Sequence, residues 1–413
     1  MSDRNRALTS LLLAVAVVWH VLSVVAPPKI GGPTKDTEGR DFASYYYAVQ
    51  AAADGSDPYE VSSLNALAKR DGTRTSVHPF FYPPPYLLAM TWVLPMDLGT
   101  GFTLWYWLNE LFLLVAALSL VRWWSALGEE FRVALAGCIA LMFGVVYSLQ
   151  MGQVNFIVLA LVVVGLWQDQ KERPVIGGAL LGLACMLKMS PALFVAWWLL
   201  RRRWVAAAAA CGAALGYTLL ALPLVGAQAQ WRFYTEVLPK FGSGDYNGLA
   251  IQIDMFGNHS LPNVLNQLVP GIDNTLSPTG QALSTAASIA LVVGLGWVLR
   301  AAPRDGWALA GQVAAVSCAT LLIPVYTYEH HLIWALPAMS LAATAVWTGR
   351  LSKIWGAPVG LAVAALCYPL PNLKQLAITT FSDWSFAAWV TQELKFVALL
   401  TVFAAATRLG ARR

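Results

Sequence analysis

The chain contains little charge. Only 12% of its 413 residues are Asp, Glu, Lys or Arg, whereas a soluble domain carries roughly 25%. This is too little charge to cover a water-facing surface, and 58% of the residues are hydrophobic. The composition argues against an ordinary soluble domain and favours a membrane protein with several spans, whose 18 Trp and 14 Tyr suit the two membrane interfaces.

Several sequence patterns are also missing. There is no HExxH or DxD motif, no internal repeat and no low-complexity tail. The net charge of +5 comes from Lys and Arg in short loops and at both ends, which indicates membrane topology rather than a nucleic-acid partner. No CxxC spacing links the cysteines, which lie inside apolar runs and are interpreted as small core residues: Cys138, Cys185, Cys211, Cys318 and Cys367.

The apolar runs predict one all-α polytopic membrane domain over 1–413, with about 10–12 transmembrane helices. The first run, after MSDRNR, is interpreted as an uncleaved span rather than a signal peptide. The runs with about the 20 residues that a span needs are 7–27, 101–123, 131–149, 152–169, 204–225, 279–301, 306–325, 331–349, 354–371 and 386–408.

Two further segments leave two topologies open. All basic clusters lie in the cytoplasm if 84–97 is a half-length helix and 175–200 is a helical hairpin with its tip at Lys188. If instead 84–97 crosses and 175–200 is one kinked span, the clusters near 122 and 171 lie outside. The first arrangement is favoured, and it makes the long segments 28–82 and 226–278 extracytoplasmic loops. Loops of about fifty residues exceed usual connections, so we expect them to carry short interfacial helices, at 41–53 and 230–240.

Two aromatic motifs lie in the first long loop. In DFASYYYAVQAAADGSDPY, Asp41 begins a predicted helix as its cap, as a general base for a hydroxyl group, or as both, since a capping Asp can still expose one oxygen. Tyr45 and Tyr46 would then line a groove for sugar or lipid. In VHPFFYPPPY, three prolines impose an extended backbone, either as a rigid join or as a wall that aims His78 or Tyr82 at a pocket.

Polar residues also interrupt the apolar runs. Gln153 and Asn155 begin a predicted helix. Either Asn155 caps or staples neighbouring helices, or the pair binds substrate or holds the catalytic loop. Lys188 is followed by Ser190 and Pro191, which predict a helix break. The lysine therefore either snorkels to the interface or, with free backbone N–H groups, binds a phosphate.

Two histidine motifs follow. In YTYEHH, Glu329, His330 and His331 stand between apolar runs. Adjacent His side chains on a helix point about 100° apart, so metal chelation is disfavoured and acid–base or phosphate-binding work by one His is preferred. His259 lies within Asn258-His259-Ser260, where helix capping is the simplest interpretation.

In this order the motifs resemble glycosyltransferase family 87, bacterial integral-membrane enzymes of the GT-C superfamily. The family includes polyprenol-phosphate-mannose-dependent α-1,2-mannosyltransferases of actinobacteria. The resemblance implies a GT-C fold in the bacterial cytoplasmic membrane, with the active site facing the periplasm or cell exterior. The matching stretches are DFASYYYAVQAAADGSDPY, FFYPPPYLL, MGQVNFIVLALVV, LKMSPALFVAWWLLRRRW, GNHSLPNVL and IPVYTYEHHLIWALPA.

The resemblance also implies site roles. Asp41 is expected to be the catalytic base, and one of His330 and His331 is expected in the active site. Where the family often has a Gln near Asn258-His259-Ser260, this chain has His259. The leaving phosphate needs cationic or hydrogen-bonding partners, for which the chain offers Lys188 together with His330, His331, His78 or Arg74.

The expected function is therefore transfer of a hexose, with mannose as the leading choice, from a polyprenyl-phosphate donor to a lipid-linked or glycolipid acceptor. The transfer is expected to invert the anomeric carbon. No metal or other cofactor is expected, because a polyprenyl phosphate is itself a good leaving group. The alternative is a transporter or flippase of a lipid-linked sugar, for which inverted repeats and matched broken helices are typical.

Overall fold

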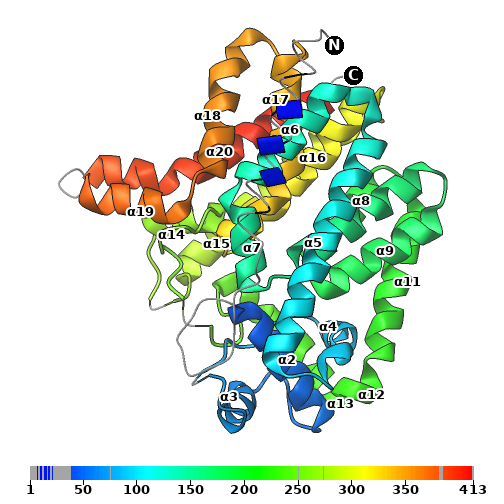
Figure 1. Cartoon of the computed structure of the whole chain (residues 1–413), viewed down its shortest axis with the longest axis vertical. Coiled ribbons are helices and arrows are strands. Elements are labelled where there is room, and N and C mark those ends of the chain that lie inside the picture. Colours follow the sequence, from blue (N-terminus) through cyan, green and yellow to red (C-terminus); the bar gives the residue numbers. More distant parts are fainter. Residues whose placement is uncertain are drawn as a thin grey trace.

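The computed structural model describes residues 39–411 except 75, 250, 273 and 381–384, together with isolated positions between 7 and 21. Helices and loops make up this part of the chain, and no β-strand occurs in it (Figure 1). The predicted all-α architecture is thus confirmed. Most of the predicted span at 7–27 lies outside the described residues.

The helices of the first half of the chain include two short 3-10 turns, which carry η labels. In chain order they are α2 (Arg40–Ala53), α3 (Val61–Arg70), α4 (Pro85–Ala89), η1 (Thr91–Val93), α5 (Leu98–Trp123), η2 (Ser125–Leu127), α6 (Glu129–Leu141), α7 (Phe143–Met151), α8 (Asn155–Gln170), α9 (Pro174–Leu187), α10 (Ala192–Leu200) and α11 (Trp204–Leu220).

The second half of the described chain is also helical. Its elements are α12 (Leu222–Val225), α13 (Ala227–Arg232), η3 (Phe233–Val237), η4 (Leu238–Ser243), α14 (Leu261–Leu268), α15 (Pro278–Leu299), α16 (Gly306–Leu322), η5 (Glu329–Ala335), α17 (Leu336–Trp347), η6 (Lys353–Trp355), α18 (Gly356–Cys367), α19 (Leu370–Thr379) and α20 (Ser385–Gly410).

Fewer helices than expected are long enough to cross a membrane. In the described part of the chain four qualify by length and composition: Leu98–Trp123, Trp204–Val225, Pro278–Leu299 and Ser385–Gly410. Two bent pairs, α6 with α7 and α18 with α19, raise this number to six if each pair is one span. The expected 10–12 came from apolar runs, and several of those runs are divided. The run at 331–349, for example, is the 3-10 helix η5 followed by the 12-residue α17.

The segment 175–200 is the predicted helical hairpin, formed by α9 and α10. Small residues let α9 pack closely against α11. Gly178 approaches Ala206, and Gly182, one turn later, approaches Ala210, so α9 and α11 run parallel. The intervening α10 must therefore run the opposite way, which places Lys188 at the tip.

The base of this hairpin lies at the opposite end from Lys188. There Arg203, after α10, meets Asp169 near the end of α8, with 2.8 Å between Nη2 and Oδ1. The neighbouring Arg201 donates to the Ala301 carbonyl at 3.1 Å and to Gln312 Oε1 at 2.9 Å. Three basic loops thus gather at one end of the molecule. The prediction that basic clusters share one side is confirmed for these loops.

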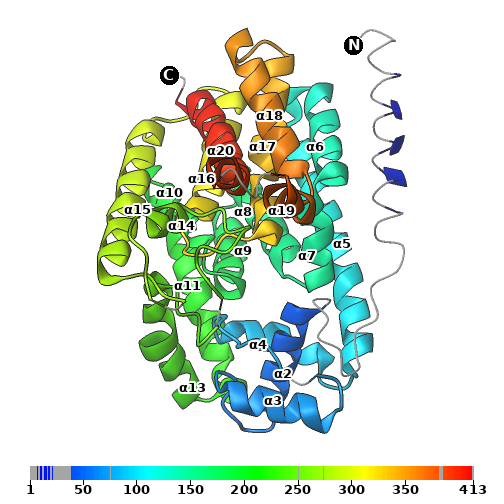
Figure 2. The ribbon, with the colours of Figure 1, turned by 90° about the vertical axis from the view of Figure 1, so that its left-hand side faces the viewer.

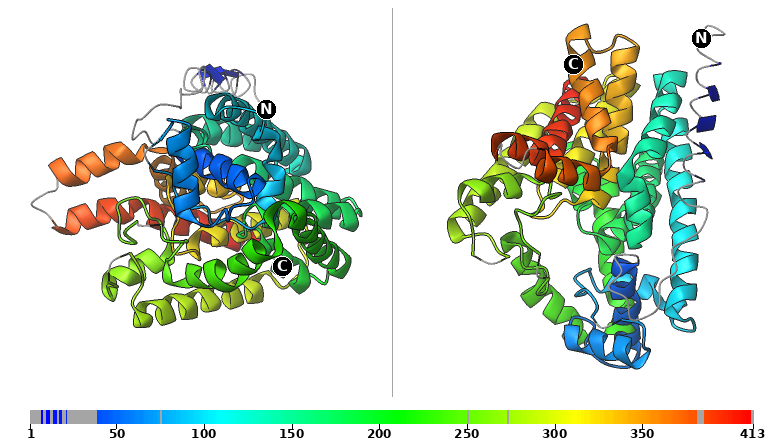
Figure 3. Two further views of the ribbon diagram at one scale, coloured as in Figure 1. Left: turned by 90° about the horizontal axis from the view of Figure 1, so that it is seen from below. Right: turned by 60° about the vertical axis from the view of Figure 1, so that its left-hand side comes forward.

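The two long loops occupy the other end. In Figures 1 and 2, α2, α3, α4 and α13 lie together below the helix bundle, and Figure 3 shows α2 and α3 across this end from below. An ion pair ties the loops together, with 2.6 Å between Arg232 Nη1 and Asp57 Oδ2. Asn247 adds a hydrogen bond to the Phe80 carbonyl at 2.9 Å. Segment 84–97 forms only α4 and η1, which are too short to cross.

Three local predictions have different outcomes. The helix predicted at 41–53 is α2. The helix predicted at 230–240 is instead divided among α13, the π-helical turn η3 and the 3-10 helix η4. Pro239 explains the break, because it lacks the N–H that would continue the α-helical ladder. Of the cysteines predicted to lie in the core, Cys138, Cys185 and Cys318 are buried, but Cys211 is exposed on α11.

Candidate active site

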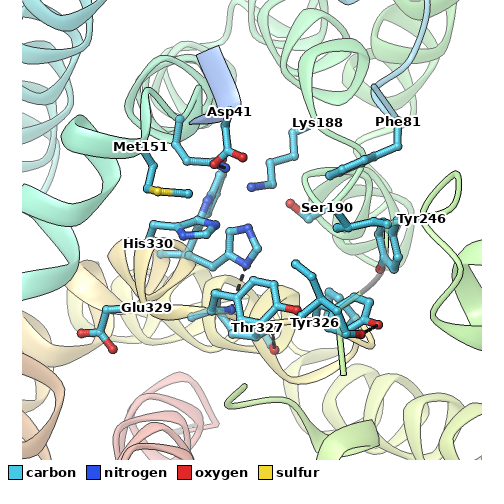
Figure 4. A pocket seen from close by; sticks show the side chains of 18 of the residues that line it. Asp41, Phe81, Met151, Lys188, Ser190, Tyr246, Tyr326, Thr327, Glu329 and His330 are labelled. Atoms are coloured by element: carbon cyan, nitrogen blue, oxygen red, sulfur yellow. Dashed lines mark hydrogen bonds between the residues drawn. The ribbon is translucent and has the colours of Figure 1, made fainter. Parts of the chain in front are cut away.

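A cavity of about 420 Å³ opens where the two long loops meet the breaks between helices. Figure 4 shows Asp41 and Lys188 pointing into it from neighbouring positions, with His330 below and Phe81 and Tyr246 to one side. The polar turns predicted to share one face thus converge on a single site. The lining residues from these turns are Arg40, Asp41, His78, Tyr82, Met151, Gln153, Lys188, Ser190, Tyr328, Glu329, His330 and His331.

Asp41 does not cap its helix, contrary to one of the two interpretations. The N-cap of α2 is Gly39, which adopts the left-handed conformation with φ 60°, and its N–H donates to the Gln150 carbonyl at 2.6 Å. Asp41 is the second residue of the helix. Its carboxylate is therefore not used for capping, and Oδ2 instead accepts a 2.5 Å hydrogen bond from Gln153 Nε2.

A chain of side-chain hydrogen bonds orients Asp41. Tyr45 donates to the Tyr82 hydroxyl at 2.9 Å, Tyr82 donates to Gln153 Oε1 at 3.5 Å, and Gln153 donates to the carboxylate. The other carboxylate oxygen, Oδ1, lies 3.9 Å from His78 Nδ1, beyond hydrogen-bond distance. One oxygen is thus held, and the other remains available to a molecule in the cavity.

Burial changes the ionisation of both groups in this pair. It raises the pKa of the Asp41 carboxyl from 3.8 to about 6, against the opposing effect of the Gln153 hydrogen bond. Burial lowers the pKa of His78 to about 4, and the nearby charges of Arg40 and Arg74 act in the same direction. At neutral pH Asp41 is therefore an anion of increased basicity, and His78 is a neutral neighbour rather than a cation.

The turn between α7 and α8 places Gln153 against Asp41. Gly152 ends α7 with φ 73°, and a Cβ at this position would lie 2.6 Å from the Cβ of Phe42. Only glycine allows both this backbone and this close approach. Trp105 Nε1 donates to the Gly152 carbonyl at 2.8 Å and fixes the turn from α5.

Lys188 is held at the hairpin tip by Asn155. Its Nζ donates to Asn155 Oδ1 at 2.7 Å, and Asn155 Nδ2 donates to the His330 carbonyl at 2.8 Å. Asn155 is fully buried and is not part of the cavity wall. Of its predicted roles, the structure supports those of joining neighbouring elements and holding the histidine turn rather than contact with substrate.

The segment leading to the histidines is fixed by Asn258-His259-Ser260. Asn258 Nδ2 and the Ser260 hydroxyl donate to the Val325 carbonyl at 2.9 and 2.8 Å, and Asn258 Oδ1 accepts from the Thr327 N–H at 2.9 Å. Ser260 also accepts from the Asn263 N–H at 3.1 Å and so caps α14, as predicted. His259 is buried behind the cavity and is not in its wall.

The two histidines both line the cavity. His331 Nδ1 accepts a hydrogen bond from the Tyr328 N–H at 3.1 Å, which assigns its proton to Nε2 and makes that atom a donor. His330 lies beside it, with ring centroids 4.2 Å apart. Within the described part of the chain, His330 Nδ1 is buried without a hydrogen-bond partner.

Tyr45 and Tyr46 are not a wall for substrate, contrary to prediction. Both are buried in the core, and Tyr46 donates to the Met96 carbonyl at 2.7 Å. Arg74 also lies outside the cavity wall. The aromatic lining, which the sequence analysis missed, comes instead from a contiguous set of rings that spans both long loops and the turn before η5: Phe81, Phe241, Tyr246, Tyr326 and Tyr328.

The described residues contain no group of three or more His, Cys, Asp or Glu side chains placed to hold a metal ion. The expectation that the reaction needs no metal stays a prediction.

Residues 80–325, more than half of the chain, match the model of glycosyltransferase family 87. The chain belongs to this family. Asp41 and His78 precede the matched region of the family 87 model, and His330 and His331 follow it. The match includes Gln153, Lys188 and other residues of the cavity wall, such as Tyr82 and Tyr246.

Mycobacterial proteins are similar to this family 87 chain. A polyprenol-phosphate-mannose-dependent alpha-(1-2)-phosphatidylinositol mannoside mannosyltransferase of Mycobacterium tuberculosis H37Rv is 27% identical over 261 residues, which are 62% of this chain and 58% of the relative. A pentamannoside mannosyltransferase of Mycolicibacterium smegmatis is 31% identical over 212 residues, 50% and 46% of the two chains. The chain thus spans about half to three fifths of the length of these relatives.

One further relative matches along most of its length. It is a pentamannoside mannosyltransferase of Mycobacterium tuberculosis CDC 1551, 24% identical over 413 residues, which are 96% of this chain and 89% of the relative. Among solved structures, ArnT from Cupriavidus metallidurans bound to undecaprenyl phosphate aligns with a TM-score of 0.45 at 17% identity. The alignment covers 98% of this chain and 76% of ArnT.

Proposed function

We propose that this family 87 protein is an inverting glycosyltransferase that moves mannose from a polyprenyl-phosphate carrier to a glycolipid acceptor. The observation that carries the proposal is the pairing, in one cavity, of an anionic Asp41 with an available oxygen and of Lys188 at a helix break. The named activities of the mycobacterial relatives support polyprenol-phosphate-mannose as the donor and a phosphatidylinositol mannoside type of glycolipid as the acceptor class.

The proposed step is a single displacement. Asp41 Oδ1 removes the proton from an acceptor hydroxyl, and the hydroxyl oxygen bonds to the anomeric carbon of the donor sugar. The bond from that carbon to the phosphate oxygen breaks, which inverts the anomeric centre. The released polyprenyl phosphate carries the negative charge, which faces the Lys188 ammonium and the Nε2–H of His331.

The proposed side of the membrane follows from charge. The basic loops around Arg201 and Arg203 lie at the end opposite the two long loops, and basic loops face the cytoplasm. The cavity, which is bounded by the long loops, then faces the periplasm or cell exterior. On this side of the bacterial cytoplasmic membrane, a lipid-linked donor supplies the sugar and no nucleotide sugar is needed.

Radiolabelled transfer tests the proposal. Purified protein in detergent is supplied with polyprenyl-phosphate-[¹⁴C]mannose and phosphatidylinositol mannosides, and the labelled glycolipid is separated by thin-layer chromatography. We expect transfer by the wild type and none by Asp41→Asn. An inactive wild type that moves the intact donor across a vesicle membrane would instead support the flippase alternative.

A further inference from the structure

Three ionisable side chains lie buried at the histidine turn, and the proposed reaction uses none of them. Glu329 is 0% exposed, and Lys395 and His259 are each 1% exposed. Lys395 Nζ lies 2.5 Å from Glu329 Oε1, and His259 Nε2 lies 3.6 Å from Glu329 Oε2. Lys395 comes from α20, the last helix of the chain, so this cluster joins α20 and the loop before α14 to η5.

Stability alone is a weak reason for such a cluster. Burying an ion pair costs desolvation energy that its attraction barely repays, and well-packed apolar residues often replace such pairs without loss. Removing only one partner is costly, because the other charge then remains buried and unpaired. A role in positioning neighbouring groups explains the presence of this pair, whereas packing does not.

The pair is located where it controls the direction of the two histidines. Glu329 is the first residue of η5, directly before His330 and His331. A 3-10 helix has three residues per turn, so consecutive side chains point about 120° apart. Figure 4 shows the Glu329 carboxylate directed away from the group formed by Asp41, Lys188 and His330. Holding Glu329 on the outer side therefore turns the next two side chains toward the cavity.

Lys395 also neutralises the negative charge of Glu329 next to a site that must accept an anion. An unpaired Glu329 carboxylate would lie buried at the edge of the cavity, in a medium of low dielectric constant, and would repel a bound phosphate. Lys395 neutralises it at 2.5 Å. The positive charge of Lys188 then remains available to the ligand.

We propose that Lys395 is a positioning residue for the donor phosphate. Through Glu329 it sets the rotation of η5, directs His330 and His331 into the cavity, and cancels the glutamate charge behind them. This inference rests on the proposed function, because it assumes a phosphate-bearing donor in the cavity.

The test compares Lys395→Met with the double variant Lys395→Met/Glu329→Gln. In the single variant the glutamate is left unpaired, and kcat/KM for the polyprenyl-phosphate donor should fall about tenfold to a hundredfold, as expected for a displaced contact group. The acceptor KM should stay within about twofold, because the Asp41 side of the cavity is unchanged. The double variant has no buried charge and should recover most of the donor kcat/KM.

Glu393→Gln is the matched control. Glu393 lies on the same helix and is also buried, but it accepts a 2.8 Å hydrogen bond from Gln267 rather than contacting η5. This variant should keep the wild-type donor kcat/KM. Melting temperatures of all variants show whether each is folded. If Lys395→Met does not fold, the donor KM and the acceptor KM are compared in the double variant and in Glu329→Gln instead.

Equilibrium binding of undecaprenyl phosphate distinguishes a failure of the proposed function from a failure of the proposed role of Lys395. A wild type that neither binds this lipid nor transfers mannose refutes the proposed function. An active wild type, with unchanged donor kcat/KM in folded Lys395→Met, refutes only the role of Lys395. A double variant that folds but regains no donor kcat/KM over the single variant also overturns the inference, because the charge pair would then not be the cause.

Discussion

Asp41→Asn should make the protein more stable at neutral pH although it removes the proposed catalytic base. The wild-type carboxyl is ionised at pH 7.5 in a site that favours the neutral acid, since burial raises its pKa from 3.8 to about 6. The side chain is only 15% exposed, so solvent screens little of this penalty. Asparagine has nearly the same shape and carries no charge.

The magnitude follows from the linkage of protonation to folding. One pKa unit corresponds to about 1.4 kcal/mol, so the ionised Asp41 costs the folded state about 3 kcal/mol at pH 7.5. Between pH 3.8 and about 6 the folded protein binds more protons at this site than the unfolded chain. Wild-type stability from this group therefore falls as the pH rises through that window, and by pH 4.5 the penalty shrinks to about 1 kcal/mol.

Thermal melting in detergent at the two pH values measures this effect. One kcal/mol shifts the melting temperature by roughly 2–4 °C in domains of 150–250 residues and by less in longer chains. We expect Asp41→Asn to melt about 5 °C above the wild type at pH 7.5 and only slightly above it at pH 4.5. Asp54→Asn is the control, because Asp54 ends the same helix but is 52% exposed and should have little effect. An Asp41→Asn variant that is no more stable than the wild type at pH 7.5 would refute the reasoning.

Three further substitutions test the geometry of the cavity. Lys188→Met should weaken undecaprenyl phosphate binding about tenfold to a hundredfold, the usual effect of losing a charged hydrogen bond; unchanged binding in a titration would mean that Lys188 does not face the phosphate. Gln153→Ala should lower kcat about tenfold while donor binding stays the same, because only the orientation of Asp41 is lost; a loss confined to donor binding would place Gln153 on the phosphate side instead. Gly152→Ala should lower the free energy of unfolding by about 2–5 kcal/mol, because of its backbone conformation and its clash with α2. The control Gly55→Ala, at φ 74° in open space, should lower it by only about 1–2 kcal/mol. Equal melting temperatures of the two variants would contradict the clash.

The hairpin tip and its lysine were predictable because their signal is local. A single Lys inside an apolar stretch, followed at once by Ser190 and Pro191, indicates a break wherever the surrounding helices lie. The convergence of the polar turns was also predictable, because the basic loops oriented all of them together. That Asp41 does not cap α2 was not predictable, because Gly39 takes the cap position and is held by the distant Gln150 carbonyl.

Other features depend on partners far apart in the chain. Tyr45 and Tyr46 follow Asp41 closely in sequence, but what covers a helix face is decided by α4, α5 and the loop at 80–82, so their burial has no local signal. Lys395 did have a signal, since Glu393 and Lys395 stand inside an apolar run, where ionisable residues are rare. Its partner Glu329 lies 66 residues away, and only the tertiary structure brings the two together.

The dependence of kcat/KM on pH tests the central role of Asp41 most directly. With the purified wild type, polyprenyl-phosphate-mannose and a glycolipid acceptor, transfer should rise tenfold per pH unit at low pH until the Asp41 carboxyl is ionised at about pH 6. It should fall again above about pH 7, because burial lowers the pKa of Lys188 to about 7 and the lysine then loses the charge that faces the phosphate. Asp41→Asn should show no transfer at any pH. A flat wild-type profile between pH 4.5 and 7.5, or full activity in Asp41→Asn, would contradict the assignment of Asp41 as the base.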